Sequence, residues 1–293
     1  MRHFFMIFTA FLIFTSQADT QENFFSYKDI YDLQFADEAS ISPDGNHIVY
    51  VRVQYDIMTD KKYSNLWYIQ PDGSEHKPLT SGKNNYSQVS WSSDSKRIAF
   101  TSNEEGKSQI FVRWMDNGST SSITNLTSAA SNLQWSPDGN MILFTGNIEE
   151  PMPVIGKIPA PPVGATWATP AKVIRHVGYK KDGAPIHAGE SYTQLFIVQS
   201  EGGAVRALTS KKTNHHQPVW SSDGKSVLFV ADFTVTADID INNERIYEMD
   251  VNSGIITQIS TKRGPYQHLS ISSDGKWLAY TGYEDKFLGY QQP

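Results

Sequence analysis

The sequence predicts an all-β protein, a β-propeller of four-stranded blades. Three observations predict it: a turn sequence that recurs five times, apolar residues at constant distances around each turn, and no helical periodicity after residue 40. Repeats of this kind are typical of propellers, in which each blade packs against its neighbours. The turns read Ser-Pro-Asp-Gly or a close variant, at 42–45, 92–95, 136–139, 221–224 and 272–275.

Each turn predicts a β-hairpin. The aspartate can accept hydrogen bonds from nearby backbone N–H groups, and the glycine after it tolerates a positive φ. Ser95 replaces that glycine in the second copy, so we expect a strained turn there. Apolar residues follow the aspartate with period two, which predicts a strand. These are Ile48, Ile98, Ile142, Val227 and Leu278, and then Tyr50, Phe100, Phe144, Phe229 and Tyr280. The residue between the two is also apolar, which predicts burial on both faces.

Two further strands complete each repeat. A third strand is predicted at 66–69, 109–112, 194–198 and 245–249, and a turn follows each of them. A closing strand is then expected at Leu79-Thr80, Leu126-Thr127, Leu208-Thr209 and Ile259-Ser260. We therefore expect blades at about 39–82, 87–128, 131–210, 216–261 and, in part, 267–293, after a lead segment at 19–38.

The third repeat is longer than the others by one proline-rich block, residues 147–191. A long insertion in a compact domain is usually functional or disordered. A degenerate blade concealed in this block is the alternative. The fifth repeat has only its first hairpin, which leaves a sheet edge unpaired. Four full blades and half a fifth predict the first part of a longer protein, with a propeller of seven or eight blades.

The N-terminus resembles a secretory signal peptide. Arg2 precedes an apolar run from Phe4 to Phe14, and small residues precede a cleavage point after Ala18. The alternative is a membrane anchor, but this run is shorter than the roughly 20 residues that span a bilayer. Cleavage of residues 1–18 predicts export to the periplasm or the medium, with no membrane span afterwards.

Composition excludes several classes of function. The formal charge of −6 argues against a nucleic-acid partner. The absence of cysteine excludes disulfides, thiolate catalysis and cysteine-ligated metals. His215 and His216 are adjacent, so on a strand they point to opposite faces and do not share a metal; a loop or rim position is expected for them. No cofactor and no metal site are predicted.

The repeats resemble those of TolB-type propellers. More specifically, the hairpins, the run Leu66-Trp67-Tyr68, and the insertion with Trp167 and Tyr179-Lys180-Lys181-Asp182-Gly183 resemble the propeller half of prolyl oligopeptidase-family serine peptidases, in the acylaminoacyl-peptidase and dipeptidyl-peptidase-like branch. The resemblance implies a propeller that gates peptide access to an α/β-hydrolase domain with a Ser-Asp-His triad.

No catalytic residue of that family can be placed on this sequence. It contains no G-x-S-x-G, on which a hydrolase of that fold carries its serine. Whether the protein is an enzyme is therefore open, and this chain alone is not expected to hydrolyse peptides. Glu149 and Glu150 are candidate substrate-binding residues, because the resemblance implies that paired propeller glutamates can hold a peptide amine; a solvated loop is the alternative.

Two functions of different classes remain. The first is the gating propeller of an exported serine peptidase, whose partners are a peptide substrate and a hydrolase domain outside this chain. The second is a non-enzymatic, TolB-like propeller that binds proteins of the cell envelope. A propeller joined to another hydrolase, such as an amidohydrolase, is also open.

Overall fold

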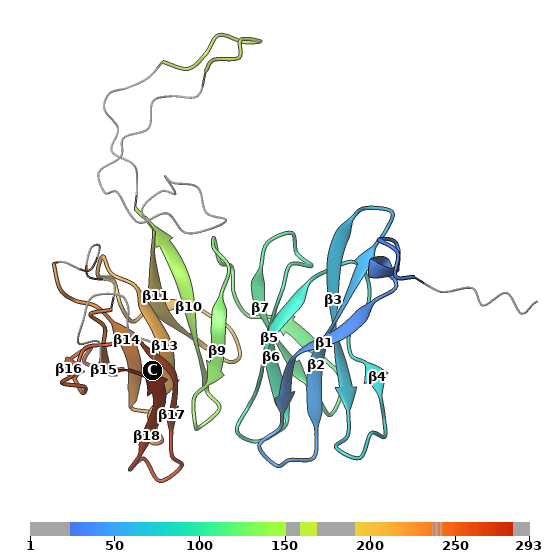
Figure 1. Cartoon of the computed structure of the whole chain (residues 1–293). Coiled ribbons are helices and arrows are strands. Elements are labelled where there is room, and N and C mark those ends of the chain that lie inside the picture. The colour runs from blue at the N-terminus through green and yellow to red at the C-terminus, as the bar shows by residue number, and fades with distance from the viewer. Residues whose placement is uncertain are drawn as a thin grey trace, which may run out of the picture.

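The structure, a computed structural model, describes residues 24–150, 159–168, 191–235, 237, 240 and 242–283. The described chain forms five antiparallel sheets that stand side by side (Figure 1). Four sheets have four strands each, and the fifth has two. The first strand of each sheet contacts the first strand of the next, so these strands lie innermost. This is the blade arrangement that the repeats predict.

The strands follow the repeats in chain order. Blade 1 contains β1 (Gln34–Ile41), β2 (Ile48–Asp56), β3 (Lys61–Ile69) and β4 (Lys77–Pro78). Blade 2 contains β5 (Tyr86–Trp91), β6 (Arg97–Ser102), β7 (Gln109–Trp114) and β8 (Thr120–Ser122). Blade 3 contains β9 (Ser131–Trp135), β10 (Met141–Glu149), β11 (Ser191–Gln199) and β12 (Arg206–Ala207). Blade 4 contains β13 (His215–Trp220), β14 (Ser226–Ala231), β15 (Arg245–Asp250) and β16 (Ile256–Gln258). Blade 5 contains β17 (Tyr266–Ile271) and β18 (Leu278–Gly282), and a short 3-10 helix at Asp29–Tyr31 precedes blade 1.

The turn between the first two strands has the same hydrogen bonds in every blade. In blade 1, the Ser42 hydroxyl donates to the Asp44 carboxylate, which also accepts from the backbone N–H of Asn46 at 3.1 Å. These two hydrogen bonds lower the pKa of Asp44. Gly45 has a φ of 77° and Ser95, its counterpart in blade 2, has a φ of 59°. Ser95 thus adopts the left-handed conformation that favours glycine, in the turn where strain is expected.

The second strands of blades 2, 3 and 4 are buried on both faces, as their continuous apolar runs predict. In blade 1 burial alternates along β2, and in blade 5 β18 is mostly exposed, so the expectation is not met in these two blades. Phe100, Phe144 and Phe229 are at most 1% exposed, and the residues before them, Ala99 and Leu143, are fully buried. These side chains fill the joints between successive blades. Burial of apolar area in these joints is the main favourable contribution to folding.

Tryptophans three residues before the turn aspartate connect successive blades. The Nε1–H of Trp91 donates to Ser40 O at 3.1 Å, and that of Trp135 donates to Ser90 O at 3.0 Å. Trp220 repeats the contact with Gln134 O at 3.4 Å. Each indole thus packs in the core and also satisfies a backbone carbonyl of the preceding blade.

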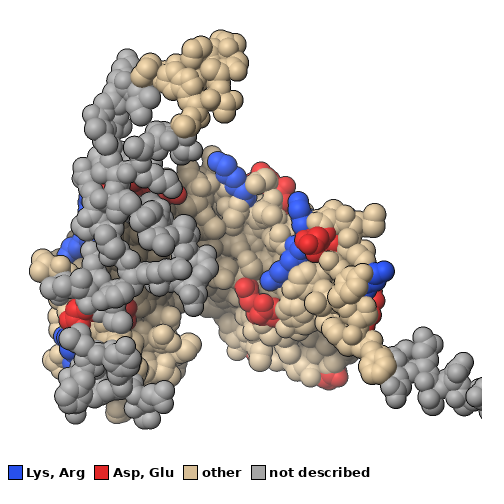
Figure 2. Space-filling model, turned by 45° about the horizontal axis from the view of Figure 1, so that its top comes forward, with Lys and Arg blue, Asp and Glu red and all other residues tan. Residues whose placement is uncertain are grey.

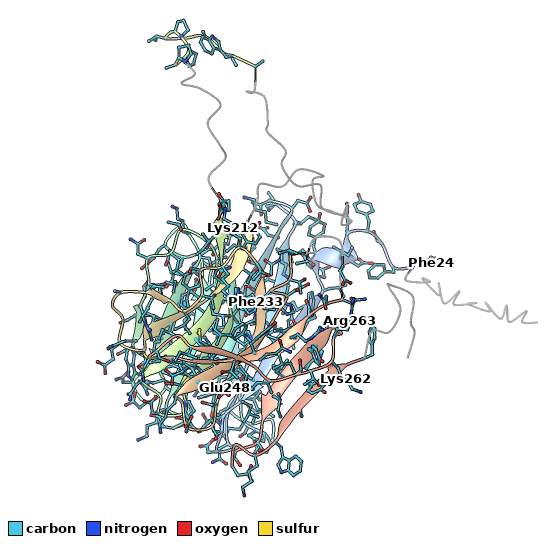
Figure 3. The ribbon with its side chains drawn as sticks, turned by 90° about the vertical axis from the view of Figure 1, so that its left-hand side faces the viewer. Phe24, Lys212, Phe233, Glu248, Lys262 and Arg263 are labelled. Carbon is cyan, nitrogen blue, oxygen red and sulfur yellow. The ribbon has the colours of Figure 1, made fainter. Side chains whose placement is uncertain are left out.

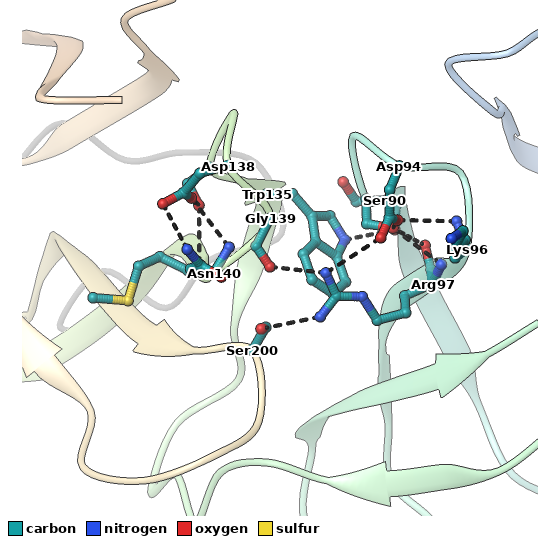
Figure 4. Close-up of polar contacts among 12 residues, drawn as sticks. Ser90, Asp94, Lys96, Arg97, Trp135, Asp138, Gly139, Asn140 and Ser200 are labelled. Atoms are coloured by element: carbon teal, nitrogen blue, oxygen red, sulfur yellow. Dashed lines mark hydrogen bonds and ion pairs between the residues drawn. The ribbon is translucent and has the colours of Figure 1, made fainter. Parts of the chain in front are cut away.

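Arg97 reinforces the joint between blades 2 and 3 (Figure 4). Its guanidinium lies 4.8 Å from the Trp135 ring centroid and donates to Gly139 O at 3.0 Å and to Ser200 Oγ at 3.3 Å. The planar guanidinium can stack on the indole and donate sideways at the same time. A side chain of blade 2 therefore holds two segments of blade 3.

Replacing Trp135 with phenylalanine should lower the free energy of unfolding by about 1–2 kcal/mol, because Ser90 O loses its donor and Arg97 loses part of its stacking surface. Urea unfolding followed by fluorescence measures this. Trp114→Phe is the matched control, since the Trp114 indole makes no hydrogen bond within the described chain. Equal losses in the two variants would contradict the role of the hydrogen bond.

The innermost strand of each blade contains one left-handed residue, six positions before the turn aspartate. The backbone N–H of Asn132 donates to the Gln88 side chain at 2.6 Å, and that of His268 donates to the Gln217 side chain at 3.0 Å. In these two cases the left-handed glutamine of one blade accepts a hydrogen bond from the left-handed residue of the next blade, at the bulge in its inner strand. The apolar pattern of the sequence does not reveal this contact. These residues are Glu38, Gln88, Asn132, Gln217 and His268, with φ between 48° and 59°.

The closing segment of blade 2 differs from the sequence prediction. In blades 1 and 3 a leucine N–H bonds back to the third strand, from Leu79 to Leu66 O and from Leu208 to Leu195 O. In blade 2 the same bond is made by Ile123, not by Leu126. The prediction at Leu126-Thr127 is therefore wrong by three residues, because a second Leu-Thr pair follows the true closing segment. Residues 126–128 instead form the connection to blade 3.

Candidate functional site

The joint between blades 2 and 3 contains a pocket of about 560 Å³. Its apolar wall includes Leu126 and the stacked rings of Phe144 and Phe196, whose centroids are 5.4 Å apart. Ser128 and Glu149 lie on its polar side. The pocket therefore combines an aromatic surface with hydroxyl and carboxylate groups.

Two repeat positions near the pocket hold small residues in blade 3. The position eight residues before the turn aspartate holds a buried ring in blades 2, 4 and 5: Tyr86, His215 and Tyr266. In blade 3 this position is Ala130. In blades 2 and 4 the ring faces a residue with a Cβ, Ser102 or Ala231, across the strand pair. The corresponding residue of blade 3 is Gly146, which lines the pocket.

The insertion begins and ends beside this pocket. Strands β10 and β11 pair as far as Glu149 and Ser191, and both of these residues line the pocket. The proline-rich block therefore lies in the connection between β10 and β11. Asn147–Glu149 belong to β10, however, so the connection is slightly shorter than the expected 147–191. Residues 151–158 and 169–190, with the predicted motif at 179–183, lie outside the described chain.

The two candidate glutamates have different environments. Glu149 is exposed and makes no ion pair within the described residues. The Glu150 carboxylate accepts from Lys212 Nζ at 2.8 Å, which joins the start of the insertion to the connection between blades 3 and 4. Figure 3 shows Lys212 at the end of the blades where the connection after β10 begins. The structure does not bring the two carboxylates onto one partner, and only Glu149 lines the pocket.

His215 and His216 point to opposite sides of β13, as expected, but His215 is not on a loop or a rim. It is fully buried and lies 5.3 Å from the Phe229 ring and 5.5 Å from the Phe233 ring. This burial lowers the pKa of His215 to about 4. His216 Nε2 instead lies 2.8 Å from a carboxylate oxygen of Glu244. The expectation of a rim position is wrong for His215, because the repeat places a buried ring there.

The described surface carries charges of both signs. Figure 2 shows acidic and basic side chains interspersed on the face in view. Across the described ranges, three or more His, Asp or Glu side chains nowhere gather as metal ligands would. In the same part of the chain, the helices are too short or too polar to cross a bilayer.

Comparison with known proteins agrees with this architecture. The family model of the TolB β-propeller domain matches residues 39–157. These residues are therefore similar to a TolB β-propeller domain. The match covers blades 1 and 2 and the first half of blade 3, including one side of the pocket. The resemblance inferred from the Ser-Pro-Asp-Gly turns is therefore confirmed.

Curated relatives of this chain carry peptidase names. The chain is 30% identical over 198 residues to the uncharacterized peptidase YuxL of Bacillus subtilis, a match that covers 67% of this chain and 29% of the relative. It is 25% identical over 256 residues to dipeptidyl-peptidase 5 of Porphyromonas endodontalis, covering 84% of this chain and 36% of the relative. The chain thus spans about a third of the length of these relatives, and it is similar to a propeller associated with peptidases.

Solved structures agree on the fold. The acylaminoacyl peptidase of Pyrococcus horikoshii superposes with a TM-score of 0.61 at 15% sequence identity, over 87% of this chain and 36% of that chain. At this identity the likeness shows the fold alone. The β-propeller prediction is confirmed by this match together with the family model.

The sequence did contain a signal for the pocket. Alignment on the turn aspartate places Tyr86, His215 and Tyr266 in one column with Ala36 and Ala130, so a ring position of the repeat is small in blades 1 and 3. This column lies outside the apolar positions nearest the turn, on which the strand prediction rests.

Proposed function

We propose that this chain is the propeller part of an exported serine peptidase, in which it admits and positions peptides for an α/β-hydrolase domain that the chain itself does not contain. The observation that carries the proposal is the match to YuxL and dipeptidyl-peptidase 5, in which this propeller accounts for about a third of a protein named as a peptidase. The lack of G-x-S-x-G in this sequence is consistent with a propeller that acts through another domain.

The geometry supports a peptide-handling role at the insertion end. The pocket, the exposed Glu149 carboxylate and the Glu150–Lys212 pair lie together where β10 ends. A carboxylate without an ion-pair partner in the described structure suits a peptide amine. We assign Glu149, supported by Glu150, as the substrate-binding pair of the proposal.

The proposal is tested on the full product of the gene, purified from its host. We expect hydrolysis of dipeptidyl or acylaminoacyl substrates that a serine-directed inhibitor abolishes. Glu149→Gln should raise KM about tenfold for substrates with a free amine and leave kcat unchanged, because it removes a binding interaction remote from the reacting bond. Glu105→Gln, an exposed glutamate in the corresponding connection of blade 2, is the control. Absence of any serine-dependent peptidase activity would overturn the proposal.

Export is part of the same proposal and has its own measurement. The segment that resembles a signal peptide, residues 1–18, lies outside the described residues. N-terminal sequencing of the protein from the extracytoplasmic fraction should begin at Asp19. Recovery of a chain that begins at Met1 in the cytoplasm would contradict it.

The second candidate is a TolB-like propeller that binds envelope proteins, and the family match over residues 39–157 favours it. It predicts a defined protein partner that co-purifies from the envelope, together with no serine-dependent hydrolysis. The activity assay on the full gene product therefore separates the two candidates.

A further inference from the structure

The pocket between blades 2 and 3 has the position and the surface of a ring site. In blade 2 the Tyr86 ring packs 5.9 Å from Phe100, and in blade 4 the His215 ring packs 5.3 Å from Phe229. Phe144 is the counterpart of these two phenylalanines in blade 3. Phe144 lines the pocket, and Ala130 stands at the repeat position that holds the ring in blades 2 and 4.

The residue across from this position is a glycine that the Phe196 ring approaches closely. Gly146 lines the pocket, and a Cβ added to it would lie 3.2 Å from the Phe196 ring. Glycine therefore lets Phe196 lie against β10 and stack on Phe144, and the two rings form the aromatic wall of the pocket. A pocket of about 560 Å³ accommodates an aromatic side chain together with part of the backbone that carries it.

The polar side of the pocket selects among aromatic groups. Glu149 is the acidic residue of its lining, and its carboxylate forms no ion pair with any described residue. The Ser128 hydroxyl donates to Asn147 O at 3.0 Å, and the Glu149 carboxylate is the charged acceptor among the described lining residues. A positive charge close to the ring of a ligand would interact favourably with Glu149.

The geometry points to a binding subsite in this pocket for an aromatic side chain that lies next to a positive charge. The ring of the ligand takes the place that Tyr86 and His215 occupy in the neighbouring blades. This inference rests on the proposed function, since it names the class of peptide that the propeller holds: one with an aromatic residue beside an amine or a basic side chain. Peptide recognition by a preformed apolar pocket with one charged group is a common arrangement.

Three small probes separate the contributions of the ring and the charge. Phenylalaninamide carries both, N-acetylphenylalaninamide carries the ring alone, and alaninamide carries the amine alone. Binding to the purified chain is measured by saturation-transfer NMR and by titration. We expect phenylalaninamide to bind about tenfold more tightly than either of the other two, because each lacks one of the two interactions. Equal binding of all three probes would overturn the inference.

The decisive variant is Ala130→Tyr, which restores the ring that blade 2 carries at this position. It should weaken the binding of both phenylalanine probes at least about tenfold, since its ring fills the pocket. Circular dichroism and thermal unfolding check its fold. Thr127→Trp, at an exposed position of the pocket wall, blocks the mouth from the surface and is used if Ala130→Tyr does not fold. Unchanged binding in a folded blocking variant would overturn the inference.

Glu149→Gln tests the charge. It should remove the preference for phenylalaninamide over its acetylated form, whereas Glu105→Gln should preserve it. A preference that persists in Glu149→Gln would contradict the assigned carboxylate. The probe assay does not depend on hydrolysis. If the protein is a peptidase but does not prefer the phenylalanine probes, only this inference is contradicted. If it prefers the phenylalanine probes but has no peptidase activity, only the proposed function is contradicted.

Discussion

Replacing Phe100 with alanine is expected to lower the free energy of unfolding by about 3–5 kcal/mol. Phe100 is fully buried in the joint between blades 1 and 2, where its ring lies 5.9 Å from Tyr86 and 5.7 Å from Phe111. The truncation loses the transfer free energy of the ring and leaves a cavity between sheets that cannot collapse independently. Urea unfolding of the purified chain measures the loss.

Tyr280 provides a matched control, because it occupies the same repeat position in blade 5. It is 50% exposed in the described structure, and its ring contact is with Tyr266 at 5.1 Å. Tyr280→Ala should therefore cost less than about 1 kcal/mol. If the two variants lost the same stability, packing between blades would not be what stabilises this position.

Acidification is expected to destabilise the protein through His215 by about 3 kcal/mol. Burial lowers the pKa of His215 from 6.5 to about 4. The unfolded chain therefore binds a proton as the pH falls through 6.5, while the folded chain binds it only near 4. Stability falls across that interval, by about 1.4 kcal/mol for each pKa unit of difference. The turn aspartates, whose pKa values lie below 3.8, contribute at lower pH.

His215→Tyr tests the origin of this effect, since tyrosine occupies the same repeat position in blades 2 and 5. The variant should keep the buried ring and lose the dependence of stability on pH between 6.5 and 4. Urea unfolding at several pH values measures how the free energy of unfolding depends on pH in the variant and in the parent protein. The same slope in the variant and the parent would show that another group is responsible. His216→Gln is the second control, because that ring is only partly buried.

Much of the fold was predictable because it depends on local chemistry. The Ser-Asp-Gly turns form from interactions within a few residues, such as the Ser42–Asp44 hydrogen bond. The double-sided burial of the second strands of blades 2 to 4 follows from their continuous apolar runs. The closing segment of blade 2 was misplaced because Ile123-Thr124 and Leu126-Thr127 both fit the local pattern, and only pairing with β7 distinguishes them.

The candidate site was only partly predictable. The insertion and Glu149 stand out in the sequence, but the pocket beside them depends on Ala130 and Gly146, residues without reactive groups. The pairing of Glu150 with Lys212 joins positions that lie far apart in the chain. His215 looked like a surface residue because histidine is polar. Its burial follows from the rings of Phe229 and Phe233, which the fold brings together.

The sequence by itself determined the repeat, the strand order within a blade, the site of the insertion and the absence of a hydrolase serine motif. Each of these features depends on residues that lie close together in the chain. Only the tertiary structure decided what lies between the blades: the tryptophan hydrogen bonds, the chain of left-handed residues on the inner strands, the buried His215 and the pocket against Phe144. These features arise where two blades meet. Their energy comes from contacts between residues many positions apart, which no local pattern records.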